Sequence, residues 1–155
     1  MPIELEVMRM TVLDVRLPAT PSEVGVWPDL HDRDVRAELT PAAIRAVARV
    51  ADRWRLTVGD VCSLLGAISE SSWHSWQRSA PAALSVDQLT RVSLLLGIYT
   101  SLHVLHPGPL ADEWVRRPNS NVLFLGRTPL DVMRVGGIPA MLEVRALLDG
   151  RRGGL

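Results

Sequence analysis

Cysteine is almost absent from this sequence of 155 residues, in which Cys62 is the single example. One cysteine excludes a disulfide bond within the chain, so a reducing cytoplasm is the default compartment. No apolar run approaches the roughly 18 residues that a membrane-spanning helix needs. The opening residues, MPIELEVMRM, carry acids where a signal peptide would carry basic residues. We therefore expect a cytoplasmic protein without membrane contact.

An excess of charge is also lacking, because 17 Lys and Arg residues balance 17 Asp and Glu residues. A strong nucleic-acid binder usually carries a basic excess or a basic stripe. The balance therefore argues against such a binder, but it leaves room for weak or partner-dependent binding. Hydrophobic residues make up 47% of the chain, enough for a real core. The length suits one ordinary domain or two very small ones.

No catalytic or metal-binding constellation is recognisable. Cys62 falls on the apolar face of a predicted helix, where a buried structural thiol is expected. His103 and His106 lie three residues apart and could share a metal, but no second cluster of ligand residues supports one. Asp112 and Glu113 are adjacent and point in different directions, unlike an acid/base pair. We expect neither enzyme activity nor a metal or cofactor.

The first 39 residues differ in pattern from the rest. Residues 3–17 alternate apolar and polar side chains for much of their length, which is the period of a half-buried strand. Residues 18–37 contain three prolines and several aspartates, a composition typical of a linker. We predict a short, extended N-terminal arm and linker over residues 1–39.

From residue 40 onward, helix starts and ends follow one another. Thr40 with Pro41 at the first helical position predicts a helix that runs to Trp54. Capping boxes and glycine stops predict the others, which cover residues 57–66, 69–78, 86–105, 109–117, 128–137 and 139–150. Residues 86–105 are apolar almost all round, so this helix should lie centrally or at a dimer interface. The predicted fold class is all-α, with regions at 40–84 and 85–155.

Residues 56–78 have the layout of a helix-turn-helix unit. Gly66 permits the left-handed backbone of the turn and Ser69 caps the second helix. Trp73 and Trp76 would pack that helix onto the domain. The outward residues, where a recognition helix meets DNA, would be Ser71, Ser72, His74, Ser75 and Arg78. An αα-hairpin that binds nothing fits the same pattern, and the helix is poor in basic residues.

A second conspicuous stretch is RRPNSNVLFLGRTPLDVMRVGG, residues 116–137. Pro118 and two asparagines break the chain before an apolar run that ends at Gly126. Thr128 and Pro129 then open a helix that closes on two glycines. Trp114 and Phe124 are the apolar side chains that could hold the intervening loop against the core.

In their order along the chain, these features resemble the Xre/MbcA/ParS family of antitoxins, the partners of RES-domain toxins. The matching landmarks are LLG, WQR, LTRVSLLLGIYTSL, EWVRRPNSN, FLGRTPLDVM and LEVRALLDG. They cover about three quarters of the chain, and the ordered set is far more specific than any one motif. The long N-terminal arm falls outside the resemblance.

The resemblance implies a two-part protein. An Xre-like helix-turn-helix part can bind the promoter of its own operon, and a C-terminal helical part binds the toxin. RES toxins resemble ADP-ribosyltransferases and degrade NAD, so the antitoxin would act by occluding their active site. The toxin-binding residues implied are Asn119, Phe124, Gly126, Arg127, Pro129, Leu130, Arg151 and Arg152. We expect the two arginines to lie on a flexible tail beyond Gly150.

Two functions therefore compete. One is a toxin-neutralising protein, expected as a homodimer within a larger toxin–antitoxin complex. The other is a stand-alone DNA-binding transcriptional regulator. Neutral charge and the large portion outside the helix-turn-helix favour the first.

Overall fold

The computed structural model describes residues 28–154, so the predicted extended segment 3–17 lies outside the described residues. Within residues 28–154 every regular element is a helix and none is a strand. The elements are α2 (Arg33–Trp54), α3 (Val58–Leu64), α4 (Glu70–Arg78), α5 (Val86–Leu105), α6 (Pro109–Glu113), the 3₁₀ helix η1 (Trp114–Arg116) and α7 (Pro129–Gly153). The predicted all-α fold class is confirmed. Within residues 28–154, none of the helices combines the length and the apolar character of a membrane span.

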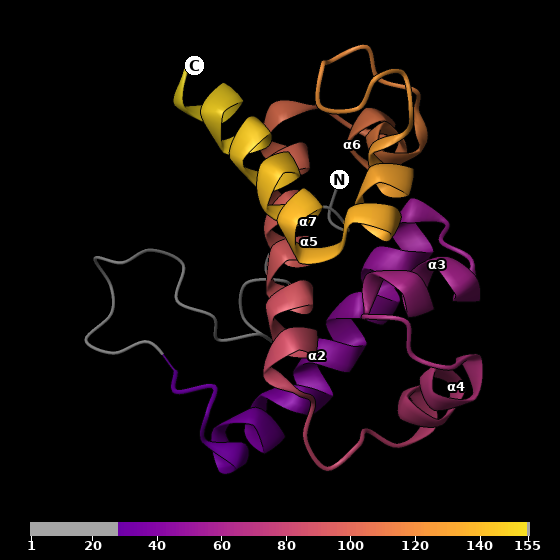
Figure 1. Cartoon of the computed structure of the whole chain (residues 1–155), viewed down its shortest axis with the longest axis vertical. Helices are drawn as coiled ribbons and strands as arrows, with labels where there is room; N and C mark the ends of the chain where they lie inside the picture. Colours follow the sequence, from indigo (N-terminus) through magenta and orange to yellow (C-terminus); the bar gives the residue numbers. More distant parts are fainter. Residues whose placement is uncertain (1–27, 155) are drawn as a thin grey trace.

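Helix α5 forms the centre of the fold. Helices α7, α2 and α6 all pack against it (Figure 1). Val92, Ile98 and Leu102 of α5 are completely or almost completely buried. A helix covered on several sides needs apolar residues around most of its circumference, which explains the unbroken apolar pattern of residues 86–105. Of the two positions that the sequence allowed for this helix, the structure shows the central one.

Helix α2 begins at Arg33, and the prediction of a start at Thr40 and Pro41 was wrong. Asp32 is the N-cap, and its carboxylate accepts a hydrogen bond of 2.8 Å from the Asp34 N–H. Pro41 therefore lies inside the helix, on its exposed side. Residues 33–39, predicted to belong to the linker, form the first turns of this helix.

Two side chains of α2 explain why the helix tolerates an internal proline. Thr40 is fully buried, and its hydroxyl donates to the Arg36 carbonyl while it accepts from the Leu84 N–H. The Arg36 guanidinium donates to the carbonyls of Leu84, Leu30 and His31. These bonds tie the first turns of α2 to the loop before α5. The long-range bonds offset the helix bond that Pro41 cannot make.

The other helix starts agree with the sequence. Both predicted capping boxes are present, Thr57 with Asp60 at the start of α3 and Ser85 with Gln88 at the start of α5. Ser69 caps α4, and Thr128 caps α7 by accepting from the Asp131 N–H at 3.1 Å. A hydroxyl or carboxylate at each of these positions satisfies backbone N–H groups that have no partner inside the helix.

Helix α7 bends at the predicted pair of glycines. Gly137 has φ 61° and ψ −146°, so the backbone leaves helical geometry there and resumes it before Pro139. The segment before the bend lies beside α3, and the segment after it runs along α5 (Figure 1). The helix ends at Gly153, so the prediction that it ends at Gly150 was wrong.

One hydrophobic core joins the two predicted regions. Val61 and Leu64 of α3 belong to the same buried cluster as Met141 and Val144 of α7. At its rim, Arg134 of α7 forms an ion pair with Asp60 of α3 at 3.1 Å. The helix-turn-helix unit and the C-terminal helix are therefore held in one arrangement. The division into regions 40–84 and 85–155 stays a prediction.

Candidate partner-binding surfaces

Helices α3 and α4 form the predicted helix-turn-helix unit. Between them, Gly66 has φ 90° and Ala67 has φ 61°, so the chain reverses through two left-handed residues. Trp73 is buried and Trp76 half-buried, and α4 packs against α3 and α2. The two tryptophans therefore hold α4 in place, as predicted.

The outward face of α4 carries the residues predicted to meet DNA. Ser71, His74, Ser75 and Arg78 are exposed. Ser72 is half-buried, and its hydroxyl accepts a 2.8 Å bond from the Ser69 hydroxyl. The Ser72 hydroxyl is therefore bonded to the residue that caps α4. The structure places these side chains together on one surface, and DNA contact by them stays a prediction.

The charge of this face is small. Glu70 lies at the start of α4 and Arg78 in its last turn, so the ends carry opposite charges. Phosphate contacts supply most non-specific affinity for DNA, and one arginine can supply little. The α4 face alone is therefore a poor electrostatic match for a nucleic acid.

Residues 118–127, here called the 118–127 loop, form a closed structure between η1 and α7. The Asn119 N–H donates to the Arg127 carbonyl at 3.1 Å, and the Gly126 N–H donates to the Asn119 carbonyl at 3.0 Å. Inside the loop, the side chains of Asn119 and Asn121 accept from the N–H groups of Asn121 and Leu123, both at 2.9 Å. The two asparagines thus fix the backbone at both ends and in the middle.

Phe124 anchors the 118–127 loop to the core. Its side chain is 0% exposed and meets the Trp114 ring edge to face, with centroids 5.7 Å apart and planes at 83°. Edge-to-face packing of aromatic rings is a preferred arrangement and adds to the burial of apolar area. The predicted anchoring role of Trp114 and Phe124 is confirmed.

The same loop turns two apolar side chains outward. Val122 is 82% exposed and Leu125 is 75% exposed. Leu125 has φ 51°, a left-handed conformation that non-glycine residues rarely adopt, and Gly126 follows with φ 81°. Val135, in the first segment of α7, is a third strongly exposed apolar residue. None of the three was predicted. Val122 and Leu125 lie in a loop, where no periodic pattern distinguishes an inward from an outward side chain, and Val135 lies on the exposed side of α7, whose buried residues include Val132 and Met133.

The predicted toxin-binding residues in this part of the chain divide by burial. Gly126 and Arg127 are exposed and Asn119 is half-buried, whereas Phe124, Pro129 and Leu130 are buried. Their assignment to toxin binding stays a prediction. The side chains of Phe124, Pro129 and Leu130 can contact a toxin directly only if the loop rearranges. In the present arrangement they hold the loop and the start of α7 in place.

Arg151 and Arg152 lie in the last turn of α7, so the prediction of a flexible tail from Gly150 onward was wrong. Asp149 explains the added turn. Its carboxylate accepts from the Arg145 guanidinium at 2.7 Å and from the Ser101 hydroxyl at 3.0 Å. Arg152 lies 3.6 Å from the same carboxylate. This network joins the end of α7 to α5 and keeps the backbone helical.

Cys62 is buried and His103 is hydrogen-bonded within the fold. Burial raises the pKa of the Cys62 thiol, and the Glu70 carboxylate raises this pKa further, so the thiol stays protonated. His103 donates through Nδ1 to the Tyr99 carbonyl at 2.9 Å, and its Nε2 lies 3.2 Å from Asp112. Within residues 28–154, no group of three or more His, Cys, Asp or Glu residues is placed to hold a metal ion.

Comparisons with known proteins agree with this arrangement of surfaces. Residues 35–97 match the family "Antitoxin Xre-like helix-turn-helix domain", and residues 102–154 match the family "Antitoxin Xre/MbcA/ParS C-terminal toxin-binding domain". The first match contains α3 and α4, and the second contains the 118–127 loop and α7.

One curated relative is the "Uncharacterized protein y4oB" of Sinorhizobium fredii (strain NBRC 101917 / NGR234). It is 39% identical over 115 residues, which cover 74% of this chain and 87% of the relative. No solved structure matches the chain. The two family matches adjoin in the order that the sequence pattern predicted. The chain therefore belongs to the Xre/MbcA/ParS family of antitoxins, with a helix-turn-helix domain followed by a toxin-binding domain.

Proposed function

We propose that this protein neutralises a co-encoded RES-domain toxin, an enzyme that degrades NAD, by binding it and covering its active site. It acts in the cytoplasm, by binding and not by catalysis, and as a homodimer within the toxin–antitoxin complex. The 118–127 loop and the adjoining start of α7 make the main contact.

The observation that carries this proposal is the combination of order and apolar exposure in the 118–127 loop. Exposed Val122 and Leu125 sit on a backbone that internal hydrogen bonds and the buried Phe124 hold fixed. Binding through an already ordered surface avoids the entropy cost of ordering it. Exposed apolar side chains on such a surface favour a protein partner over a nucleic acid.

The second part of the proposal concerns the promoter of the toxin–antitoxin operon. The exposed residues Ser71, His74, Ser75 and Arg78 support a DNA-facing role for α4. Because this face carries little positive charge, we propose that promoter binding is weak for a single chain and depends on a second copy.

The test is a titration of the co-encoded toxin with the full-length protein while NAD consumption is measured. We expect activity to fall to zero at a fixed molar ratio. Leu125→Ala should raise the dissociation constant at least tenfold, because about 1.4 kcal/mol of apolar contact corresponds to that factor.

The matched control is Val104→Ala, which removes another exposed apolar side chain, on α5 and outside the loop. It should titrate the toxin like the unaltered protein. Equal losses from both substitutions would show that the loop has no special part in binding. A toxin that keeps consuming NAD at saturation with bound antitoxin would exclude occlusion of the active site.

A further inference from the structure

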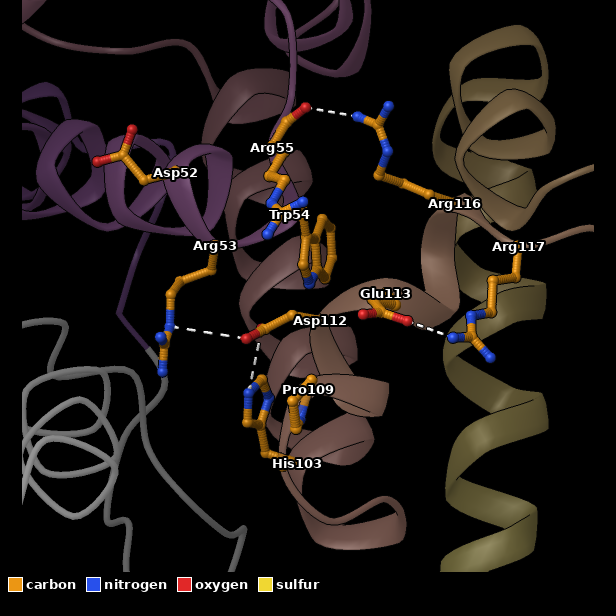
Figure 2. Close-up of a pocket in the computed structure, with 11 residues that line it drawn as sticks. Asp52, Arg53, Trp54, Arg55, His103, Pro109, Asp112, Glu113, Arg116 and Arg117 are labelled. Carbon is orange, nitrogen blue, oxygen red and sulfur yellow. Dashed lines mark hydrogen bonds and ion pairs between the residues drawn. The ribbon is translucent and has the colours of Figure 1, made fainter. Parts of the chain in front are cut away.

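A cavity of about 540 Å³ lies between the end of α2, the C-terminal half of α5 and the segment formed by α6 and η1 (Figure 2). Its volume falls within the range of sites that bind small molecules. The walls carry Arg53 and Arg55 from one side and Arg116 and Arg117 from the other. Neither surface assigned to toxin or DNA includes this cavity.

Two of the four arginines are neutralised by carboxylates within the cavity. Arg53 lies 3.8 Å from Asp112, and Arg117 pairs with Glu113 (Figure 2). The other two, Arg55 and Arg116, have no carboxylate partner in residues 28–154. Their positive charge is therefore available to a ligand.

Arg55 and Arg116 lie on segments that a hydrogen bond joins. Arg116 donates a hydrogen bond to the Arg55 carbonyl, which joins the end of α2 to η1 (Figure 2). Arg55 has φ 52° and ψ 47°, a left-handed conformation for a non-glycine residue. This conformation ends α2, and the Arg55 N–H donates to the carbonyls of Ala51 and Asp52. Asp52 also lines the cavity, but its carboxylate points away from both arginines in Figure 2.

A buried donor provides a second, independent sign of a ligand. Trp54 is 0% exposed, and its indole N–H has no acceptor within the described part of the chain. This side chain lines the cavity, and the nitrogen edge of the ring is turned toward α6 in Figure 2. A buried N–H without a partner is costly, so a ligand that accepts this hydrogen bond gains affinity.

We propose that this cavity binds a small molecule that carries an oxyanion, either a phosphate or a carboxylate. The oxyanion lies between Arg55 and Arg116, because a guanidinium group matches both kinds of oxyanion with paired N–H donors. A second acceptor on the ligand takes the hydrogen bond from the Trp54 indole. The ligand bridges the helix-turn-helix domain, which supplies Arg55, and the toxin-binding domain, which supplies Arg116.

The test uses the indole N–H signals of the full-length, ¹⁵N-labelled protein in nuclear magnetic resonance spectra. The five tryptophans give separate signals, and Trp54→Phe identifies the one from Trp54. Inorganic pyrophosphate and citrate are titrated in separate arms. We expect a saturable shift of the Trp54 signal with a dissociation constant below about 1 mM. A response to pyrophosphate alone identifies a phosphate ligand, and a response to citrate alone identifies a carboxylate ligand. A response to both shows that the cavity recognises an oxyanion of either kind.

Substitutions locate the binding site. Arg55→Gln and Arg116→Gln should each weaken binding at least tenfold, whereas Arg45→Gln, at an exposed arginine of α2 that does not line the cavity, should leave it unchanged. Arg116→Lys keeps the charge without the paired donors and should weaken binding less than Arg116→Gln, provided that the Trp73 signal shows a folded protein. A Trp54 signal that moves with neither anion would overturn the proposal. Equal weakening by Arg45→Gln would also overturn it.

Discussion

The outward face of α4 and the 118–127 loop differ in nearly every physical property. The α4 face is polar, almost neutral, and built on a regular helix held by Trp73. The loop exposes Val122 and Leu125 and is built on an irregular backbone with two left-handed residues. Each is fixed to the core by aromatic side chains of its own, α4 by Trp73 and Trp76 and the loop by Phe124.

From this difference we expect unequal affinities at the two surfaces. Hydroxyl groups and a single arginine can read a DNA groove but supply little affinity. Exposed apolar side chains on a rigid support supply affinity for another protein. The comparison predicts a strong protein partner and a weak nucleic-acid partner.

The largest effect should come from removing the anchor of the loop. Phe124→Ala deletes a fully buried ring that packs against Trp114, and such deletions cost about 3–5 kcal/mol. Thermal or denaturant unfolding should show this loss. Val122→Ala, on the outward side of the same loop, should change the stability by less than about 0.5 kcal/mol. Similar losses from the two substitutions would contradict the division into an inner and an outer side.

A smaller effect should follow from a methyl group at Gly126. Its φ of 81° disfavours any other residue, although nothing within 4 Å would meet the added carbon. Gly126→Ala should therefore cost about 1 kcal/mol through backbone strain alone.

Gly150→Ala is the matched change, since this glycine lies inside α7 and also has nothing within 4 Å. There alanine should stabilise the helix by up to about 1 kcal/mol. Unfolding free energies that shift in the same direction in both variants would exclude strain as the cause at Gly126.

The weakness of the α4 face can be measured through salt. Arg78→Ala should lower affinity for the promoter DNA equally for all sequences, and should reduce the slope of log K against log salt by about 1. Ser75→Ala should leave this slope unchanged, because it removes no charge. A slope that does not respond to Arg78→Ala would exclude this arginine from the DNA contact.

The smallest expected effect concerns pH. Burial lowers the pKa of His106, and the nearby Arg151 lowers this pKa further. The folded state therefore disfavours the charged imidazole. Neutral His106 therefore contributes its full stability to the fold above the pKa of the unfolded state, about 6.5. This contribution is lost as pH falls through the lower pKa of the folded state.

His106→Gln should consequently lose less stability than the unaltered protein between about pH 6.5 and 5. Arg151→Gln, which removes only the second cause, should give an intermediate result. Melting temperatures across this range are the measurement. Parallel curves for all three proteins would show that His106 has the same pKa in the folded and unfolded states.

Features set by neighbouring residues could be predicted from the sequence. The capping boxes at Thr57 and Ser85 need only a partner three residues away, and both are present. The glycines at 136–137 predicted a break because backbone freedom is a local property, and the chain bends at Gly137. The apolar pattern of residues 86–105 likewise predicted a helix covered on most of its surface, although it left open whether that cover comes from the same chain or from a second copy.

Features set by distant residues could not be predicted in this way. Helix α2 begins early because Arg36 and Thr40 bond to Leu84, which lies more than 40 residues further on. The last turn of α7 depends on Ser101 of another helix. The pairing of Arg116 with Arg55, which shapes the cavity, joins residues separated by 61 positions. Long-range side-chain bonds of this kind leave no periodic trace in the sequence.

Hydrogen exchange of the protein with and without the co-encoded toxin shows directly which surface the toxin covers. We expect toxin to slow exchange at backbone N–H groups of the 118–127 loop and the start of α7, while residues 70–78 of α4 exchange at the same rate in both states. Protection of α4 with no change in the 118–127 loop would show that the toxin binds the helix-turn-helix unit instead.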